Sequence, residues 1–268
     1  MQIVDTGSGS PLVLVPGVQG RWEWMKPAVD ALALRCRVIT FSLADEPTAR
    51  APFDESRGFS CYVEQIGSAM DQAGLQQAAV GGISYGGAIA AAFAARHPER
   101  VSSLILVSAL PPRWQPDARA RLYLKAPRLL SPLFFIRSVF LYREIAEAHD
   151  GVLQGALAAL RHAVNVLRHM LSPARMARRV RLLAAAGLAG EITRLDVPTL
   201  LITGEDRLDS VVPPVRTREY LAICPGAECV TLPRTGHLGL ITRAGEFARI
   251  VATFIDGAGA RENRRRIG

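Results

Sequence analysis

The sequence predicts an α/β fold with one mostly parallel sheet that is covered by helices on both faces. Short apolar runs alternate with amphipathic stretches along most of the 268 residues, as they do in βαβ units. Apolar residues make up 49% of the chain and charged residues 21%, a composition that excludes an intrinsically disordered protein. Every uninterrupted apolar run is shorter than about 18 residues, so we expect no membrane span.

The individual elements follow from these runs and from the helical spacing between them. Strands buried on both faces read as continuous apolar runs, and such runs predict strands at 11–15, 37–41, 75–80, 101–107, 198–203 and 227–232. Apolar residues at helical spacing predict helices at 22–34, 60–73, 88–96, 214–223 and 242–255, with Ser60 as an N-cap. These elements define a predicted α/β core at 1–111 and 191–257.

Residues 112–190 show helical spacing only, and we expect them to form an α-helical lid over the carboxyl ends of the strands. This segment holds twelve Arg and one Lys against four acidic residues, a net charge of +9 in a chain whose total is +8. Residues 258–268 are basic and polar and are expected to form a flexible tail. Because the rest of the chain is slightly acidic, the charge distribution does not indicate a nucleic-acid binder.

The stretch around Ser84 predicts a nucleophile. Ser84 stands in a Gly-x-Ser-x-Gly motif between an apolar strand and an alanine-rich helix, which is the context of a nucleophile elbow. A serine on so tight a turn needs small neighbours, and Gly82 and Gly86 supply them. The motif alone is also compatible with a glycine-rich βα turn that carries an incidental serine.

A serine nucleophile needs a base, and His237 is the best candidate among five histidines. It follows the last predicted strand, in a loop at the same edge of the sheet as Ser84, and it completes the chain order Ser, acid, His. The acid is expected after the strand at 198–203, where Glu205, Asp206 and Asp209 all lie in one loop.

Four motifs together resemble the α/β-hydrolase superfamily: Pro16-Gly17, the elbow at Ser84, the acid loop after Gly204, and Gly236-His237. The resemblance covers nearly the whole chain and implies a serine hydrolase with a Ser-His-Asp triad. The position that the acid usually takes in the superfamily, counted from Gly204, is Arg207, which cannot serve as an acid. The nearest carboxylate to this position is that of Asp206. Counting back from Pro213 reaches Asp209 instead, because this loop has two extra residues. We prefer Asp209, which leads directly into the next helix, and keep Asp206 as the alternative.

The resemblance also implies an oxyanion hole formed by the backbone N–H groups of Val18 and Tyr85. Trp22 and Trp24, just after the first of these, either line the substrate pocket or are core aromatics of the first helix. The sequence contains no metal-site spacing, no phosphate loop and no dinucleotide fingerprint, so we expect no metal and no cofactor.

The expected activity is hydrolysis of an ester, a thioester or a similar activated carbonyl of a small, hydrophobic molecule. C–C bond hydrolysis or a biosynthetic cyclisation is the alternative, because the same triad serves these reactions, and a small-molecule receptor is the non-enzymatic alternative. The four cysteines lack metal-ligand spacing, and the first residues lack the features of a signal peptide. We therefore expect a cytoplasmic protein with reduced thiols; the sequence makes no prediction of oligomeric state.

Overall fold

The computed structural model describes residues 1–130, 144–145, 147–149, 151–169 and 172–267. Within these residues seven strands form one sheet: β1 (Ile3–Thr6), β2 (Pro11–Val15), β3 (Arg37–Phe41), β4 (Ala78–Ile83), β5 (Val101–Val107), β6 (Thr199–Thr203) and β7 (Glu228–Thr231). Their order is β1-β3-β2-β4-β5-β6-β7. β1 runs antiparallel to β3, and all other neighbouring pairs are parallel. The predicted α/β fold with a mostly parallel sheet is confirmed.

The order of the strands reverses between β2 and β4, at the centre of the sheet. The chain leaves β2 for β3 on one side and leaves β4 for β5 on the other side. At such a switch point the two following loops diverge and leave a crevice at the carboxyl ends of the strands, where ligands of open α/β sheets bind. Pro16 and Gly17 follow β2 and Ser84 follows β4, so both lie at this point.

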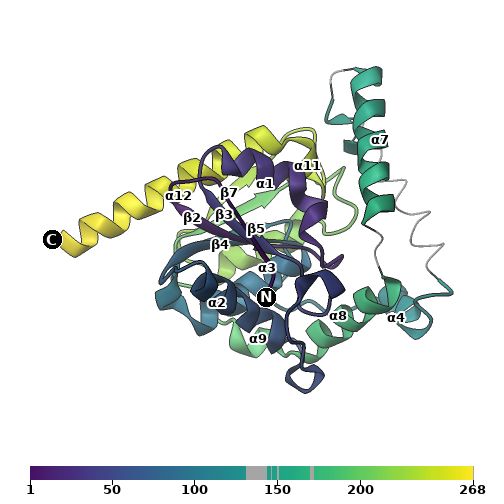
Figure 1. The fold of residues 1–268 in the computed structure, drawn as a ribbon, viewed down its shortest axis with the longest axis horizontal. Coiled ribbons are helices and arrows are strands. Elements are labelled where there is room, and N and C mark those ends of the chain that lie inside the picture. The colour runs from purple at the N-terminus through teal and green to yellow at the C-terminus, as the bar shows by residue number, and fades with distance from the viewer. Residues whose placement is uncertain (131–143, 146, 150, 170–171, 268) are drawn as a thin grey trace.

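Helices cover both faces of the sheet (Figure 1). Outside the segment between β5 and β6 they are α1 (Lys26–Ala33), α2 (Ser60–Gln72), α3 (Tyr85–Arg96), α10 (Pro214–Thr217), α11 (Gly239–Thr242) and α12 (Ala244–Ile267). Short 3-10 turns lie at Trp22–Met25, Pro47–Ala49, Glu55–Arg57, Pro98–Arg100 and Arg218–Ala222. α1 packs against α12 on one face, and α2 packs against α3 on the other.

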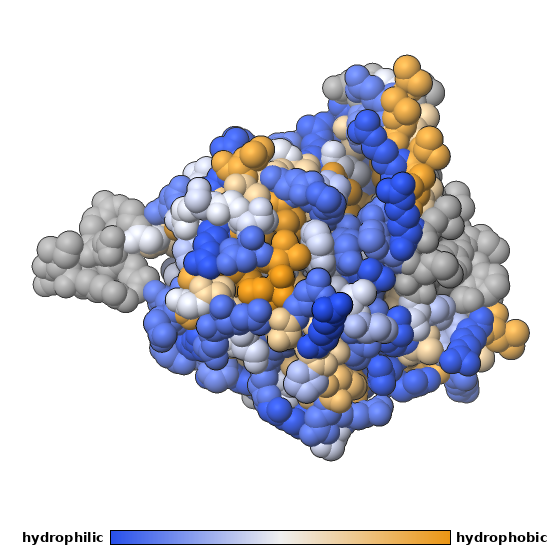
Figure 2. Space-filling model, viewed as in Figure 1, coloured by the Kyte–Doolittle hydropathy of each residue, from blue (hydrophilic) through white to orange (hydrophobic). Residues whose placement is uncertain are grey.

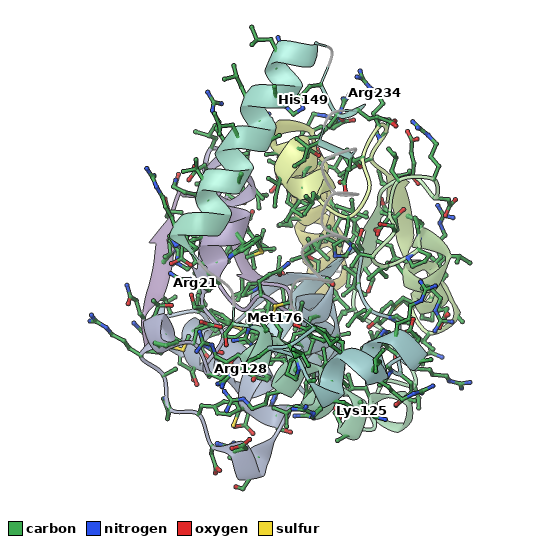
Figure 3. The ribbon with its side chains drawn as sticks, turned by 90° about the vertical axis from the view of Figure 1, so that its right-hand side faces the viewer. Arg21, Lys125, Arg128, His149, Met176 and Arg234 are labelled. Carbon is green, nitrogen blue, oxygen red and sulfur yellow. The ribbon has the colours of Figure 1, made fainter. Side chains whose placement is uncertain are left out.

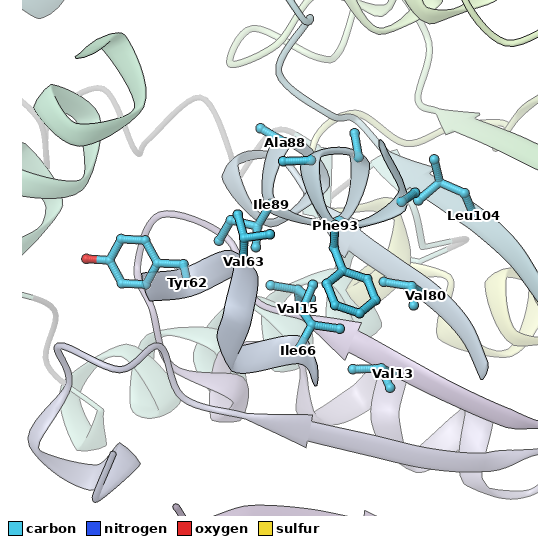
Figure 4. Close-up of a cluster of buried hydrophobic side chains, with 14 of the residues drawn as sticks. Val13, Val15, Tyr62, Val63, Ile66, Val80, Ala88, Ile89, Phe93 and Leu104 are labelled. Carbon is cyan, nitrogen blue, oxygen red and sulfur yellow. The ribbon is translucent and has the colours of Figure 1, made fainter. Parts of the chain in front are cut away.

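Successive residues of β2 point into two separate cores. Val13 and Val15 pack in the cluster beneath α2 and α3, together with Phe93 (Figure 4). Leu12 and Leu14 pack in the cluster beneath α1 and α12. Because both faces of the sheet are covered, the strand is apolar at nearly every position, which is why the sequence shows a continuous run.

Between β5 and β6 the described residues form helices and no strand, as the sequence predicts. The helices are α4 (Ala118–Lys125), α7 (Val152–Arg168), α8 (Pro173–Ala185) and α9 (Leu188–Glu191). α7 stands apart from the sheet (Figure 1) and exposes Leu153, Leu157 and Leu160 along one face, where Figure 2 shows apolar surface. Residues 131–143, 146, 150 and 170–171 of the expected lid lie outside the described residues.

The structure differs from the sequence-based predictions at three places. β1 was missed, because this short edge strand is only half-buried and lacks a continuous apolar run. The closing helix does not end at 255; α12 continues to Ile267, through a segment that contains the good helix formers Ala and Arg. Ser60 is not the N-cap of α2, which is Phe59; the Ser60 hydroxyl instead accepts a hydrogen bond from Arg96 at 3.1 Å.

In the part of the chain that is described, none of the helices has both the length and the apolar character that crossing a membrane requires.

Candidate functional site

Ser84 lies on a strained turn at the carboxyl end of the central strand β4. Its φ of +54° is in the region that side chains other than glycine rarely adopt. Backbone hydrogen bonds hold the turn on both sides: Ser84 N–H donates to Val107 O at 2.9 Å, and Leu110 N–H donates to Ser84 O at 3.2 Å. The side chain is largely buried, at 8% exposure. The sequence context of a strand, a tight turn and a helix is therefore present.

The two glycines of the motif have no room for a side chain. A Cβ on Gly82 would lie 2.2 Å from Gly86 O, and a Cβ on Gly86 would lie 2.4 Å from Pro16 O. The second contact also shows that the loop after β2 lies against the elbow. This loop carries Val18, which is partly buried. Tyr85 is the first residue of α3, so its N–H has no acceptor within the helix.

His237 and Asp209 lie together in the loops that follow β7 and β6. His237 Nδ1 is 3.3 Å from Asp209 Oδ2, and both side chains are buried. The other carboxylate oxygen of Asp209 accepts hydrogen bonds from the N–H groups of Val211 at 3.0 Å and Val212 at 2.9 Å. The two loops approach closely at Gly236, where a Cβ would lie 2.6 Å from the backbone of the Asp209 loop.

Asp206, the alternative acid, lies elsewhere. Its side chain is 68% exposed and pairs with Arg218 at 3.6 Å. The extra residues of this loop thus carry Asp206 to the surface, while the residues before Pro213 turn back toward His237. The geometry favours Asp209 as the partner of the imidazole.

The surroundings of this pair shift both pKa values toward the charged forms. Burial by itself raises the pKa of Asp209, but His237, the N–H of Val212 and the hydroxyl of Ser108 outweigh burial and hold that pKa below its ordinary value. Burial lowers the pKa of His237, while the carboxylates of Asp209 and Glu144 raise it, and the net pKa is above the ordinary value.

Glu144 is a buried carboxyl group beside His237 that the sequence did not identify. Its Oε1 accepts a hydrogen bond from Leu238 N–H at 2.6 Å, and its Oε2 is buried without a hydrogen-bond partner in the described part of the chain. Burial raises the pKa of Glu144 to about 7, against the opposing effects of the N–H groups of Gly236 and Leu238 and of His237. Glu144 precedes Leu238 by 94 residues, so no local pattern connects them.

A second contact joins the same segment to the His237 loop. Arg234 donates from Nε to Glu147 O at 2.9 Å and from Nη2 to His149 O at 3.0 Å. Figure 3 shows Arg234 and His149 next to each other at one end of the molecule. Glu144, Glu147 and His149 therefore lie against the loop that carries His237.

The two tryptophans lie in the 3-10 turn before α1. Trp22 packs against the core cluster beneath α1 and α12, as the core interpretation predicts. Trp24 donates from Nε1 to His169 O at 3.1 Å, and Asn165 donates to Glu23 O at 3.1 Å. These contacts attach the end of α7 to the turn, near Arg21 (Figure 3). A role of either tryptophan in a substrate pocket stays a prediction.

Comparisons with known proteins agree with this architecture. The chain is 28% identical over 270 residues to a 2-hydroxymuconate semialdehyde hydrolase from a Pseudomonas species, a match that covers 96% of this chain and 90% of that protein. It is 27% identical over 262 residues to a pimeloyl-(acyl-carrier protein) methyl ester esterase from Aeromonas hydrophila, covering 93% and 96% respectively. The crystal structure of an enol-lactonase from Burkholderia xenovorans shares the fold with a TM-score of 0.75 at 20% identity, covering 95% and 96%.

These relatives are hydrolases, and the solved structure is an enzyme of the same fold. Residues 10–244 match the family described as the alpha/beta hydrolase fold. Together with the seven-stranded sheet, this match shows that the chain belongs to the alpha/beta hydrolase family of enzymes.

Proposed function

We propose that this protein is a serine hydrolase that cleaves an ester, a thioester or a similar activated carbonyl of a small hydrophobic molecule. The observation that carries the proposal is the buried pair of His237 and Asp209 at the same carboxyl edge of the sheet as the strained Ser84. Among the described residues Asp209 orients the imidazole through Nδ1, which leaves Nε2 to exchange a proton with a serine hydroxyl.

In the proposed reaction the Ser84 hydroxyl attacks the carbonyl carbon while His237 accepts its proton. Asp209 stabilises the imidazolium that forms. Collapse of the tetrahedral intermediate then breaks the bond to the leaving group, which takes the proton from His237. Water, activated by His237 in the same way, hydrolyses the resulting acyl-enzyme and regenerates Ser84.

The backbone N–H groups of Val18 and Tyr85 are the proposed oxyanion donors. Two observations support this assignment: the loop after β2 lies against the elbow at Gly86, and the N–H of Tyr85 has no acceptor inside α3. Tyr85 N–H is at the positive end of α3, where a negative oxygen is stabilised, and the loop that carries Val18 lies against the elbow at this end. Removal of one such donor typically lowers the rate by about 10²–10³.

Residues 112–190 are proposed to act as a helical lid over this site. Their described parts contact the core at three places: Glu144 binds the His237 loop, the end of α7 binds the turn before α1, and α8 reaches the loop that carries Val18. A lid of this kind excludes water from the reacting carbonyl and supplies apolar surface to the substrate.

C–C bond hydrolysis is the second candidate. One relative, at 28% identity over 96% of this chain, is named for the hydrolysis of 2-hydroxymuconate semialdehyde, whereas another is named as a methyl ester esterase. The same three side chains serve both reaction types, so the substrate decides between them. The receptor alternative has no support from the relatives, which are hydrolases.

A substrate panel of acyl esters, thioesters, lactones and diketones, measured with wild type and Ser84→Ala, tests the proposal. We expect turnover of at least one class by wild type and none above background by Ser84→Ala. Ser68→Ala, which changes an exposed serine of α2, serves as the matched control. A fluorophosphonate probe is expected to label wild type and the control at Ser84 and to leave Ser84→Ala unlabelled. Wild-type turnover by Ser84→Ala would overturn the proposal.

A further inference from the structure

Arg179 of α8 is the largest fully buried side chain of the described residues, and it is charged. It has no exposed surface and lies against two carboxylates of the loop after β3. Its guanidinium donates to Asp45 Oδ1 at 2.7 and 3.0 Å and to Glu46 Oε1 at 2.5 Å. Both carboxylates are themselves buried, so each needs a cationic partner.

Two neighbouring arginines on the same helix also serve these carboxylates. Arg178 pairs with Asp45 at 3.2 Å, and Arg175 pairs with Glu46 at 3.0 Å. Arg178 and Arg175 are about one-third exposed, at 32% and 29%. Two cations besides Arg179 therefore balance the two carboxylates, and charge balance alone does not account for a third arginine at this position.

Arg179 differs from its neighbours in a contact with the loop after β2. Its Nη1 donates to Val18 O at 2.9 Å. In the described part of the chain, neither Arg175 nor Arg178 makes this contact. Val18 is the residue whose N–H is the proposed oxyanion donor, and a bond to its carbonyl restricts the backbone rotation that would turn this N–H away.

The loop is shaped around the guanidinium. Gly20 N–H donates to Gly17 O at 2.9 Å and closes a turn around Val18. Gly20 has a φ of +79°, and a Cβ at this position would lie 2.3 Å from Arg179 Cζ. Gly20 O accepts from Leu43 N–H at 2.7 Å, which ties the turn to the segment that carries Asp45 and Glu46. Arg179 is thus enclosed by the turn on one side and by the two carboxylates on the other.

We propose that Arg179 is a positioning residue that holds the turn at Val18, and thereby the Val18 N–H, in the orientation needed for oxyanion stabilisation. It does so from α8, so the segment between β5 and β6 takes part in forming the oxyanion hole. The inference rests on the proposed function, because it assumes that Val18 N–H stabilises the transition state at Ser84. Asp45 and Glu46 hold the guanidinium, and the guanidinium holds the loop.

Comparison of Arg179→Lys with Arg178→Lys tests this inference. Lysine keeps the charge but cannot bridge Asp45, Glu46 and Val18 O together, because it lacks the planar fork of donors. Arg178 serves as the matched control, since it pairs with the same Asp45 carboxylate without contacting Val18. The measurements are the labelling rate of Ser84 by a fluorophosphonate, and kcat and KM for the best ester of the substrate panel.

We expect Arg179→Lys to lower both the labelling rate and kcat by about 10²-fold, with KM within about threefold of wild type, because an oxyanion hole acts in the transition state and not in substrate binding. Arg178→Lys is expected to stay within about twofold of wild type in all three quantities. Wild-type labelling by Arg179→Lys, or an equal loss in both variants, would overturn the inference. If wild type itself is not labelled at Ser84, the proposed function fails, and this inference fails with it.

A second variant covers the case in which Arg179→Lys does not fold. The triple variant Asp45→Asn, Glu46→Gln, Arg179→Met removes the three fully buried charges together, so no buried charge is left unpaired. Arg175 and Arg178 lose their partners, but both are about one-third exposed and can be solvated by water. It leaves Val18 O without its donor and is expected to show the same loss of about 10²-fold in labelling rate and kcat. A folded triple variant with the wild-type labelling rate would contradict the role of Arg179.

Discussion

His237 Nδ1 lies 3.3 Å from Asp209 Oδ2, although the two residues are 28 positions apart in the chain. The contact joins the loops after two neighbouring parallel strands, β6 and β7, which end at the same edge of the sheet. The other oxygen of Asp209 is fixed by two backbone N–H groups, so the carboxylate has one orientation available for the imidazole. This pair is the basis of the proposed mechanism and of the first prediction.

Asp209→Asn is expected to lower kcat by about 10³–10⁴, because the amide no longer stabilises the imidazolium and favours the wrong tautomer of His237. Asp206→Asn is the matched control and is expected to change kcat by less than about twofold, since an exposed ion pair contributes little. Steady-state kinetics on the best substrate of the panel makes the comparison. If Asp206→Asn lowered kcat more than Asp209→Asn does, Asp206 and not Asp209 would be the acid that orients His237.

Glu144→Gln is expected to move the acidic limb of the kcat/KM profile to lower pH. His237 must be neutral to accept the serine proton, and the carboxylate of Glu144 raises the pKa of His237. Glutamine keeps an acceptor for Leu238 N–H but removes the charge, so the pKa of His237 falls. Glu147→Gln is the control, because Glu147 pairs with Arg207 at the surface. An unchanged limb in Glu144→Gln would show that this carboxyl does not influence the base.

The same variant is expected to change how stability depends on pH. The pKa of Glu144 rises from an ordinary value of 4.5 to about 7 in the folded protein, so folding favours its protonated form. The stability that this group contributes is complete below about pH 4.5 and is lost as pH rises through about 7, a loss on the order of 3 kcal/mol. The free energy of unfolding of wild type and of Glu144→Gln is measured in urea at about pH 5 and at about pH 8. These two values lie on either side of most of this titration. If wild type and Glu144→Gln lose equal stability between these pH values, folding does not raise the pKa of Glu144.

Two glycine substitutions of opposite expected sign test the packing of the elbow. Gly86→Ala is expected to destabilise the protein by at least about 2 kcal/mol, because the new methyl group meets backbone oxygen atoms that cannot move independently. Gly257→Ala lies on an exposed face of α12 with nothing within 4 Å and is expected to stabilise it by about 0.5–1 kcal/mol. Urea midpoints of the two variants are compared with wild type. A neutral Gly86→Ala would mean that the loop after β2 lies farther from the elbow than in this structure.

The sequence by itself determined the fold and most of the sheet. Strands buried on both faces need apolar residues at nearly every position, so their signal is local, and β3 and β5 match the predicted ranges 37–41 and 101–107. The elbow was equally predictable, since the glycines at 82 and 86 are required by contacts within a few residues of Ser84 and with the adjacent loop. The position of His237 followed from topology, because parallel strands end at one edge.

The sequence favoured Asp209 over Asp206, three positions away in the same loop, but only the tertiary structure shows that Asp209 contacts His237 and Asp206 does not. The two aspartates differ in how deeply they are buried and in which residue they contact, and the path of the loop determines both differences. The roles of Glu144 and Arg179 were also outside the reach of the sequence, where they read as two members of a charged helical segment. Each acts through a contact with backbone atoms of a distant loop, Leu238 N–H and Val18 O. Any residue type supplies such backbone groups, so these contacts leave no pattern in the sequence and exist only once the chain is folded.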